Sequence, residues 1–182
     1  MKPEKERATR VAILSVFGFA ILVAFLMGPI TKTRAETTTY RVTQYDVHLD
    51  SLRVGDKEAH VIALFSRKGL AHLENGEVAD YTTWGTADLI RGKGLVNGYA
   101  TLTYNDGSVT VSRLHGTTER GMVNLSGEFT IGTGRFAGIN GTMTVSGKSL
   151  MPFAEERGTT DDGCYEITAT YSVPSRETAA NQ

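Results

Sequence analysis

The 182-residue sequence contains only one cysteine, Cys164, and this scarcity limits the chemistry open to the protein. A single cysteine cannot form an intramolecular disulfide, and it cannot build a cysteine-based metal cluster. Cys164 lies between Gly163 and Tyr165 at the expected start of a strand. We therefore expect it to be buried as a small apolar residue rather than to act as a reactive thiol.

An excess of positive charge is also missing, since the whole chain has a net charge of -1. Residues 1–36 contain six Lys or Arg and three Asp or Glu, which leaves thirteen and seventeen, or -4, for residues 37–182. An acidic domain without a basic cluster is not expected to bind nucleic acid.

Familiar catalytic and metal-binding motifs are absent as well. The four histidines are scattered and form no H-x-H or H-E-x-x-H pair, so we predict no bound metal. Ser126 lies in Leu125-Ser126-Gly127 and not in a G-x-S-x-G nucleophile elbow. We predict no cofactor, and we assign no catalytic residue from the sequence.

One long apolar run, Val11–Ile30, contains no charged residue among its twenty positions. As an α-helix it would be about 30 Å long, which matches the hydrocarbon core of a bilayer. It exceeds the roughly 7–15 apolar residues typical of a cleaved signal peptide. Three interpretations stay open: a membrane anchor or uncleaved signal, a signal cleaved after Ala35, and a helical lid over an apolar cavity of the same chain.

We favour a single membrane span, with the polar tail 1–10 in the cytoplasm and the rest of the chain outside. Four basic residues precede the run, which agrees with this orientation, although Lys32 and Arg34 follow it directly. In the alternative, the protein is cytoplasmic and the helix is a lid. A lid should present a polar face to solvent, but Ser15 is the only polar side chain in the run.

Behind this run, the chain is rich in glycine and in short segments of Val, Thr, Tyr and Phe. Eighteen of the 20 glycines follow residue 50. Turn-forming dipeptides recur at Asn75-Gly76, Asn97-Gly98, Asp106-Gly107, Asn140-Gly141 and Asp162-Gly163. The candidate strands between them are 38–49, 60–67, 76–90, 98–104, 108–115, 122–131, 141–147 and 164–173.

This pattern predicts an all-β domain over residues 37–174, folded as a closed antiparallel barrel of about eight strands. Residues 31–36 would be a linker, and the polar tail 175–182 would be disordered. In the hairpin 99–113, alternation predicts one face with Thr101, Thr103, Thr110 and Ser112 and another with Leu102, Tyr104, Val109 and Val111.

The segment 129–147, FTIGTGRFAGINGTMTVSG, follows a G-x-G-x-F-x-G-x-x-G pattern. It resembles the signature of the allene oxide cyclase-like barrel superfamily, which includes allene oxide cyclases, dirigent proteins, and bacterial spirotetronate and spirotetramate cyclases. The segment 164–173 is similar to the last strand of such barrels. The resemblance implies that the motif is a structural cap at one end of the barrel, made by Gly132, Gly134, Phe136, Gly138, Ile139 and Gly141.

The resemblance implies a cofactor-independent cyclase or isomerase that encloses a hydrophobic, unsaturated small molecule, for example in a polyketide-like [4+2] cyclisation. Such a barrel would act by holding a reactive conformer and excluding water. The alternative is a non-catalytic barrel, tethered to a membrane or exported, that binds a lipid or another hydrophobic ligand. It could also be a subunit of a membrane complex. Because related barrels often pair, a homodimer is compatible with the resemblance.

A small-molecule site in a barrel is expected to be apolar with a few well-placed polar groups. Aromatic side chains with hydroxyl or N–H groups suit a ligand that carries a carbonyl. The candidate pocket residues on this basis are Gln44, Tyr45, Tyr81, Trp84, Tyr104, His115, Glu128 and Tyr165.

Overall fold

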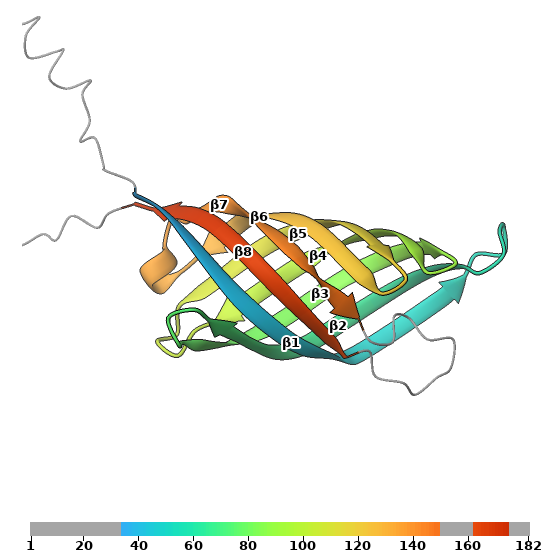
Figure 1. Cartoon of the computed structure of the whole chain (residues 1–182), viewed down its shortest axis with the longest axis horizontal. Helices are drawn as coiled ribbons and strands as arrows, with labels where there is room; N and C mark the ends of the chain where they lie inside the picture. The colour runs from blue at the N-terminus through green and yellow to red at the C-terminus, as the bar shows by residue number, and fades with distance from the viewer. Residues whose placement is uncertain (1–33, 150–161, 175–182) are drawn as a thin grey trace, which may run out of the picture. The chain divides into compact units, whose positions relative to one another are not determined.

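The computed structural model describes residues 34–149 and 162–174, and these form a closed barrel of antiparallel strands (Figure 1). Each strand pairs with the next along the chain, and β1 pairs with β8 to close the barrel. The elements are β1 (Arg34–Arg53), β2 (His60–Leu73), β3 (Val78–Ile90), β4 (Lys93–Thr103), β5 (Val109–Glu119), β6 (Met122–Gly132), the 3-10 turn η1 (Gly134–Phe136), β7 (Asn140–Ser149) and β8 (Gly163–Val173). The predicted all-β barrel of about eight strands is confirmed.

The predicted N-terminal helix Val11–Ile30 and the tail 175–182 lie outside the described residues. In the part of the chain that the structure describes, no helix has the length and apolar character needed to cross a membrane. β1 begins at Arg34, so the last three residues of the predicted linker 31–36 belong to the strand.

Two of the tight turns use residues that the sequence analysis did not single out. In Arg91-Gly92 and in Arg120-Gly121, both residues have positive φ, as two-residue hairpin turns require.

The predicted turn at Asn97-Gly98 is wrong, because both residues lie inside β4. Gly98 is opposite Gly85, and a Cβ at Gly98 would lie 2.3 Å from the Trp84 carbonyl oxygen. This glycine therefore permits a close approach of two strands rather than a chain reversal.

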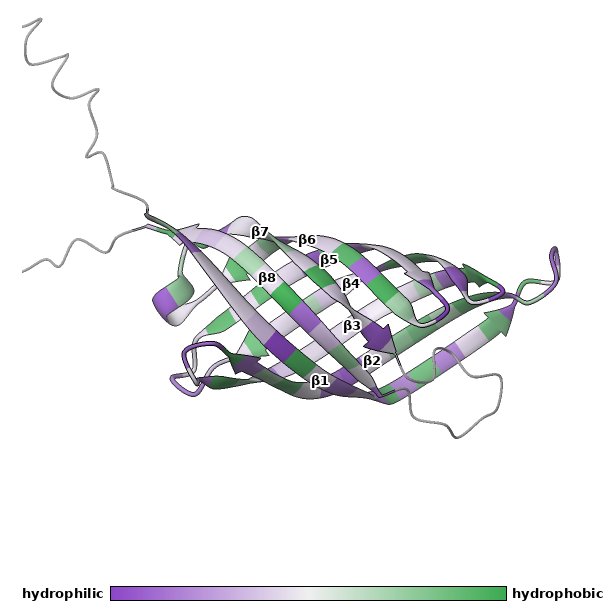
Figure 2. Cartoon of the chain, viewed as in Figure 1, coloured by the Kyte–Doolittle hydropathy of each residue, from purple (hydrophilic) through white to green (hydrophobic). Residues whose placement is uncertain are grey.

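Hydrophobic and hydrophilic bands alternate along the strands (Figure 2). The faces predicted for the hairpin 99–113 are wrong for β5. Thr110 and Ser112 are buried inside with Leu102 and Tyr104, whereas Thr101, Thr103, Val109 and Val111 face outward or are only half-buried. The reason is the register, which places Leu102 opposite Thr110 and Ala100 opposite Ser112, and directly opposed residues share a face.

Cys164 is exposed, so the expectation of a buried thiol is wrong. Its neighbours Gly163 and Tyr165 are both buried. Successive residues of a strand point to opposite faces, and the side chain of Cys164 therefore points outward.

The middle of the barrel is filled by apolar side chains. Val42, Leu102 and Ile167 are fully buried there, together with the hydroxyl side chain of Ser112. On β1, β5 and β8, a residue nearer one end of the barrel lines one cavity and a residue nearer the other end lines a second. On β4 only the first cavity is lined, but Tyr104, which directly follows β4, lines the second. The packed centre therefore divides the interior into two cavities.

The cap motif connects β6 to β7 through η1 at the end of the barrel where β1 begins (Figure 1). Phe136 and Ile139 are each 8% exposed and join the main core. Gly134 has a φ of +58°, and a Cβ there would lie 2.2 Å from Ser108 Oγ, so this position requires glycine. Asn140-Gly141 opens β7 instead of forming a two-residue hairpin turn.

Candidate functional site

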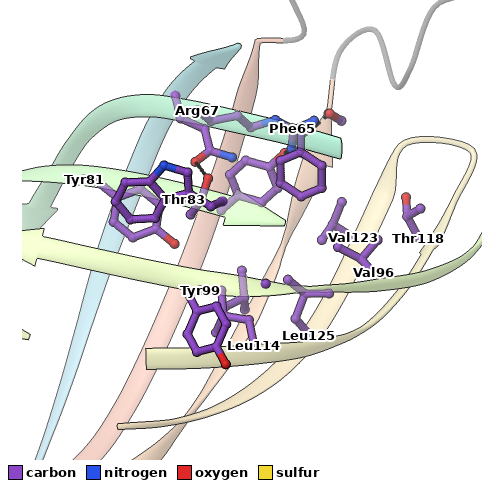
Figure 3. A pocket seen from close by; sticks show the side chains of 16 residues that line it. Phe65, Arg67, Tyr81, Thr83, Val96, Tyr99, Leu114, Thr118, Val123 and Leu125 are labelled. Carbon is purple, nitrogen blue, oxygen red and sulfur yellow. Dashed lines mark hydrogen bonds between the residues drawn. The ribbon is translucent and has the colours of Figure 1, made fainter. Parts of the chain in front are cut away.

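The candidate site is the cavity at the end of the barrel away from η1, which we call the distal cavity (Figure 3). All eight strands contribute to its wall. Its apolar lining consists of Phe65, Val96, Leu114, Val123, Leu125 and Val145. Its polar lining consists of Gln44, Arg67, Tyr81, Thr83, Thr118, Ser149 and Tyr165. The free volume is about 50 Å³.

A buried ion pair supports one side of the cavity. Arg67 Nε lies 2.5 Å from Asp46 Oδ1, and both side chains are only 7% exposed. The two residues face each other across the β1–β2 pair, immediately before a register shift between Asp46 and His48. The Arg67 guanidinium also lies over the Phe65 ring, 4.6 Å from its centroid. Phe65 and Arg67 are thereby held against the cavity as one unit.

Weaker polar contacts extend this arrangement to β8 and β7. Arg67 Nη1 lies 3.5 Å from the Tyr165 hydroxyl, which in turn lies 3.4 Å from Ser149 Oγ. On the neighbouring wall, Thr83 Oγ1 donates to Gln44 Oε1 at 3.3 Å. At these lengths the hydroxyl groups can exchange partners with a ligand oxygen at small cost.

Tyr81 supplies a phenol that stays protonated. Burial raises the pKa of Tyr81 well above its usual value, the nearby Tyr165 raises this pKa further, and Arg67 lowers it. The neutral phenol is a hydrogen-bond donor at physiological pH, and it is therefore suited to a carbonyl or hydroxyl oxygen.

Thr118 adds a hydroxyl that the barrel itself leaves unsatisfied. The residue is 2% exposed and lines the cavity. Its Oγ1 has no hydrogen-bond partner within residues 34–149 and 162–174. A buried hydroxyl without a partner is costly, so an oxygen or water in the cavity would relieve this cost.

The structure brings three of the eight predicted pocket residues together. Gln44, Tyr81 and Tyr165 are buried and line the distal cavity. Trp84 reaches the edge of this cavity, but its side chain is 49% exposed on the outer face. Tyr104 is buried at the opposite end of the barrel and lines the other cavity.

The remaining three residues, which were predicted to line the pocket, lie on the outer surface of the barrel. Tyr45 is half exposed beside a surface groove. His115 is exposed, and Glu128 is exposed and forms an ion pair with Arg113. The physical reason is strand alternation: His115 follows Leu114, which already points inward, and Glu128 is paired with the outward-facing Arg113.

Sequence reasoning missed Asp46, Phe65, Arg67, Thr118 and Ser149. The segment 61–67 offered one signal, because Ala63, Phe65 and Arg67 share a face by period two. An arginine on a face with Ala and Phe marks a candidate for a buried, paired charge. No such signal identified Asp46 as its partner, since the pairing depends on a β1–β2 register with an irregularity.

The chain matches no protein-family model, and no curated protein matches its sequence. Its structure is similar to the pterocarpan synthase dirigent protein GePTS1, with a TM-score of 0.51 at 10% identity, over 82% of this chain and 96% of that one. A second dirigent protein, the pterocarpan synthase PsPTS1, gives a TM-score of 0.44 at 12% identity, over 79% and 97%. The first match supports a dirigent-like barrel, and it does not specifically support an allene oxide cyclase or a spirotetronate or spirotetramate cyclase. The chain therefore has the eight-stranded barrel fold of dirigent proteins.

Proposed function

We propose that the distal cavity binds a small, mainly apolar molecule that carries a neutral oxygen group. The proposal rests mainly on the lining of this cavity, where the hydroxyl-bearing side chains of Tyr81, Tyr165 and Thr118 stand among apolar side chains. Apolar pockets with a few convergent polar groups are the usual form of small-molecule sites. Phe65 and Leu125 would contact the carbon skeleton, and Tyr81 would donate to the oxygen.

The size of the cavity narrows the ligand class. Its free volume of about 50 Å³ is well below the roughly 300–1,000 Å³ of typical sites for drug-sized ligands. A monocyclic compound, or one end of a longer one, would therefore bind only if flexible side chains such as Leu125 moved and enlarged the cavity.

The same geometry supports one kind of chemistry, a ring closure or isomerisation of the bound molecule without a cofactor. An enclosed site can hold an unsaturated ligand in one reactive conformation. The protonated phenol of Tyr81 would stabilise negative charge that develops on a carbonyl oxygen.

A non-catalytic role as a binding protein is the second candidate, and the lining of the cavity favours it. Among the described residues, those that line the distal cavity include no Asp or Glu, and the neighbouring Asp46 is held in an ion pair with Arg67. A reaction that requires proton abstraction by a carboxylate is therefore less compatible with this cavity than binding alone.

Cyclohexanone and methylenecyclohexane form a matched pair of probes, because they differ in an oxygen and have similar shapes. Trp84 is the only tryptophan and lies at the cavity edge, so its fluorescence can report binding. We expect cyclohexanone to bind about five- to tenfold more tightly than the hydrocarbon, as one good hydrogen bond allows.

Tyr81→Phe and Thr118→Val should remove most of this preference without changing the cavity shape. Tyr45→Phe changes a half-exposed outer tyrosine that does not line the distal cavity, and it is the matched control. Equal affinity for both probes in the unmodified protein, or an unchanged preference in both variants, would reject the proposal.

A further inference from the structure

The second cavity lies at the opposite end of the barrel, beside η1, and we call it the cap cavity. It has a free volume of about 300 Å³, several times that of the distal cavity. Its lining includes Glu36, Tyr40, Glu77, Tyr104, Thr110, Phe129, Arg135, Phe136 and Tyr171. The packed centre of the barrel separates it from the distal cavity, so it can be considered as a site of its own.

Aromatic rings form much of this lining. The Tyr104 and Phe136 ring centroids are 4.7 Å apart, and Phe136 and Tyr171 are 6.0 Å apart in an edge-to-face arrangement. The Arg135 guanidinium lies over both Tyr104 and Phe136, 4.6 Å and 4.9 Å from their centroids. These rings therefore already accept one cation of the chain itself on their π faces.

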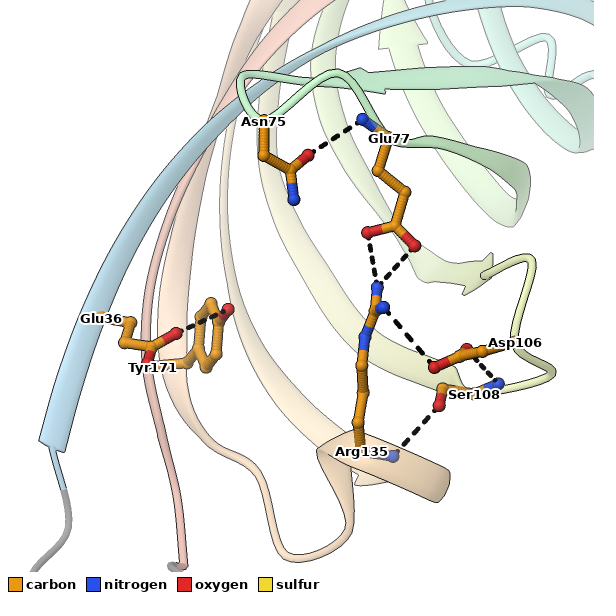
Figure 4. Close-up of polar contacts among 7 residues, drawn as sticks. All are labelled: Glu36, Asn75, Glu77, Asp106, Ser108, Arg135 and Tyr171. Carbon is orange, nitrogen blue, oxygen red and sulfur yellow. Dashed lines mark hydrogen bonds and ion pairs between the residues drawn. The ribbon is translucent and has the colours of Figure 1, made fainter.

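Carboxylates outnumber cationic groups around the cavity (Figure 4). The two Glu77 oxygens lie 2.7 Å and 2.6 Å from Arg135 Nη2, and Asp106 Oδ2 lies 3.5 Å from Arg135 Nη1. Across the mouth, Glu36 accepts a hydrogen bond from the Tyr171 hydroxyl at 3.4 Å. Two carboxylates thus contact the Arg135 guanidinium, and the third, Glu36, lies across the mouth. These three carboxylates outnumber that cation.

Hydroxyl groups extend the polar character deeper into the cavity. Thr110 is 1% exposed and lies beside Tyr104. Its Oγ1 has no hydrogen-bond partner of normal length and angle among the described residues. Tyr40 is also buried on this side of the packed centre. An unsatisfied buried hydroxyl at the inner wall indicates that the cavity accepts a group able to form hydrogen bonds.

We propose that the cap cavity binds a small organic ammonium ion that carries a hydroxyl or carbonyl group. The methylated or alkylated nitrogen would lie against the aromatic side chains, as quaternary ammonium ligands do in aromatic cages. Glu36 would balance its charge, and Thr110 would contact its oxygen. An anionic ligand is disfavoured, because Arg135 is already neutralised by Glu77 and Asp106.

Choline, 3,3-dimethylbutan-1-ol and 3,3-dimethylbutanoate make a suitable probe series, because they have nearly the same shape and are cationic, neutral and anionic. Binding to the full-length chain can be followed by saturation-transfer difference NMR. We expect saturable choline binding, about tenfold tighter than binding of the neutral alcohol, and weaker binding still of the carboxylate.

Glu36→Gln should weaken choline binding about threefold, as expected for loss of a solvent-exposed carboxylate. Tyr171→Leu should weaken it further by removing an aromatic surface. Glu119→Gln is the control, because it removes an exposed carboxylate that pairs with Lys93 on another part of the barrel.

Three results would overturn this assignment: no saturable choline binding, equal binding of the neutral alcohol, or the same loss in Glu119→Gln as in Glu36→Gln. Cyclohexanone binding in the distal cavity should not change in any of these variants. Failure of the cap-cavity assignment is therefore distinguishable from failure of the proposed function.

Discussion

Arg67 and Asp46 form a buried ion pair across the β1–β2 register, with Nε and Oδ1 2.5 Å apart. Removal of one partner of a buried ion pair usually costs about 3–5 kcal/mol, because the remaining buried charge loses its counter-charge in the pair. We therefore expect Asp46→Ala to lower the free energy of unfolding by about this amount, as measured by urea denaturation. The double variant Asp46→Ala/Arg67→Met should lose less than Asp46→Ala alone, because it also removes the buried guanidinium. A double variant that is less stable than the single one would contradict this account.

Phe136 anchors the cap motif, with its ring packed against Tyr104 and Tyr171. Phe136→Ala should destabilise the barrel by about 3–5 kcal/mol, the usual cost of truncating a buried aromatic residue. Ile131→Ala is the matched control, since Ile131 lies close in sequence but is 54% exposed. Its effect should stay within about 0.5 kcal/mol, as for most surface substitutions. A Phe136→Ala effect as small as the control would show that the motif does not stabilise the barrel end.

The barrel was predictable because the strands carry their own local signals. Glycine punctuation and runs of Val, Thr and Tyr located all eight strands, and the spacing of Phe136 and Ile139 located the cap. The inward face was not predictable where both faces of a strand carry similar residues. On β5, Thr110 and Ser112 point inward while Val109 and Val111 are half-buried, which reverses the polarity expected for a barrel with an apolar interior.

The candidate site was less predictable than the fold for a related reason. Tyr81, Gln44 and Tyr165 were identified by residue type, and their strands happen to point them inward. His115 and Glu128 were selected by the same criterion and point outward. The direction of each side chain depends on inter-strand register, including the irregularity after Asp46, and a single sequence does not contain this information.

His60 connects the β1–β2 loop to β3 through two carboxylates. Its Nδ1 contacts Asp56, and its Nε2 lies 2.8 Å from Asp88 Oδ1. The hydrogen bonds to Asp56 and Asp88 raise the pKa of His60, and the His60 contact lowers the pKa of Asp56. A histidine pKa that is raised by folding stabilises the native state below the unfolded-state pKa of about 6.5, and this contribution is lost as pH rises through the folded-state pKa.

The difference in thermal midpoint between the unmodified protein and His60→Gln should therefore be larger near pH 5.5 than near pH 8.5. His115→Gln, which alters an exposed histidine on the outer face, is the matched control for the substitution itself. A His60→Gln difference that is the same at both pH values would contradict the proposed role of this ion cluster.

We propose that the apolar run Val11–Ile30 anchors the protein in a membrane with the barrel outside the cytoplasm. Insertion is favourable because Leu, Ile, Phe and Val each contribute about -0.3 to -0.6 kcal/mol at a helix centre, and no charge in the run opposes them. The full chain should then stay in the membrane fraction after washing with high salt and with alkaline buffer. A chain that starts at Arg34, the first residue of β1, should be soluble and give a β-dominated circular dichroism spectrum.

Ligand binding in the same truncated chain separates this anchor from the alternative, in which the run is a lid. An anchor is dispensable for binding, so the truncated chain should keep the cyclohexanone preference of the distal cavity. A lid contributes to the enclosed site, and its removal should sharply reduce affinity while the barrel stays folded. If the full-length protein stays soluble without detergent, the run of twenty uncharged residues is not embedded in a bilayer, and the anchor is rejected.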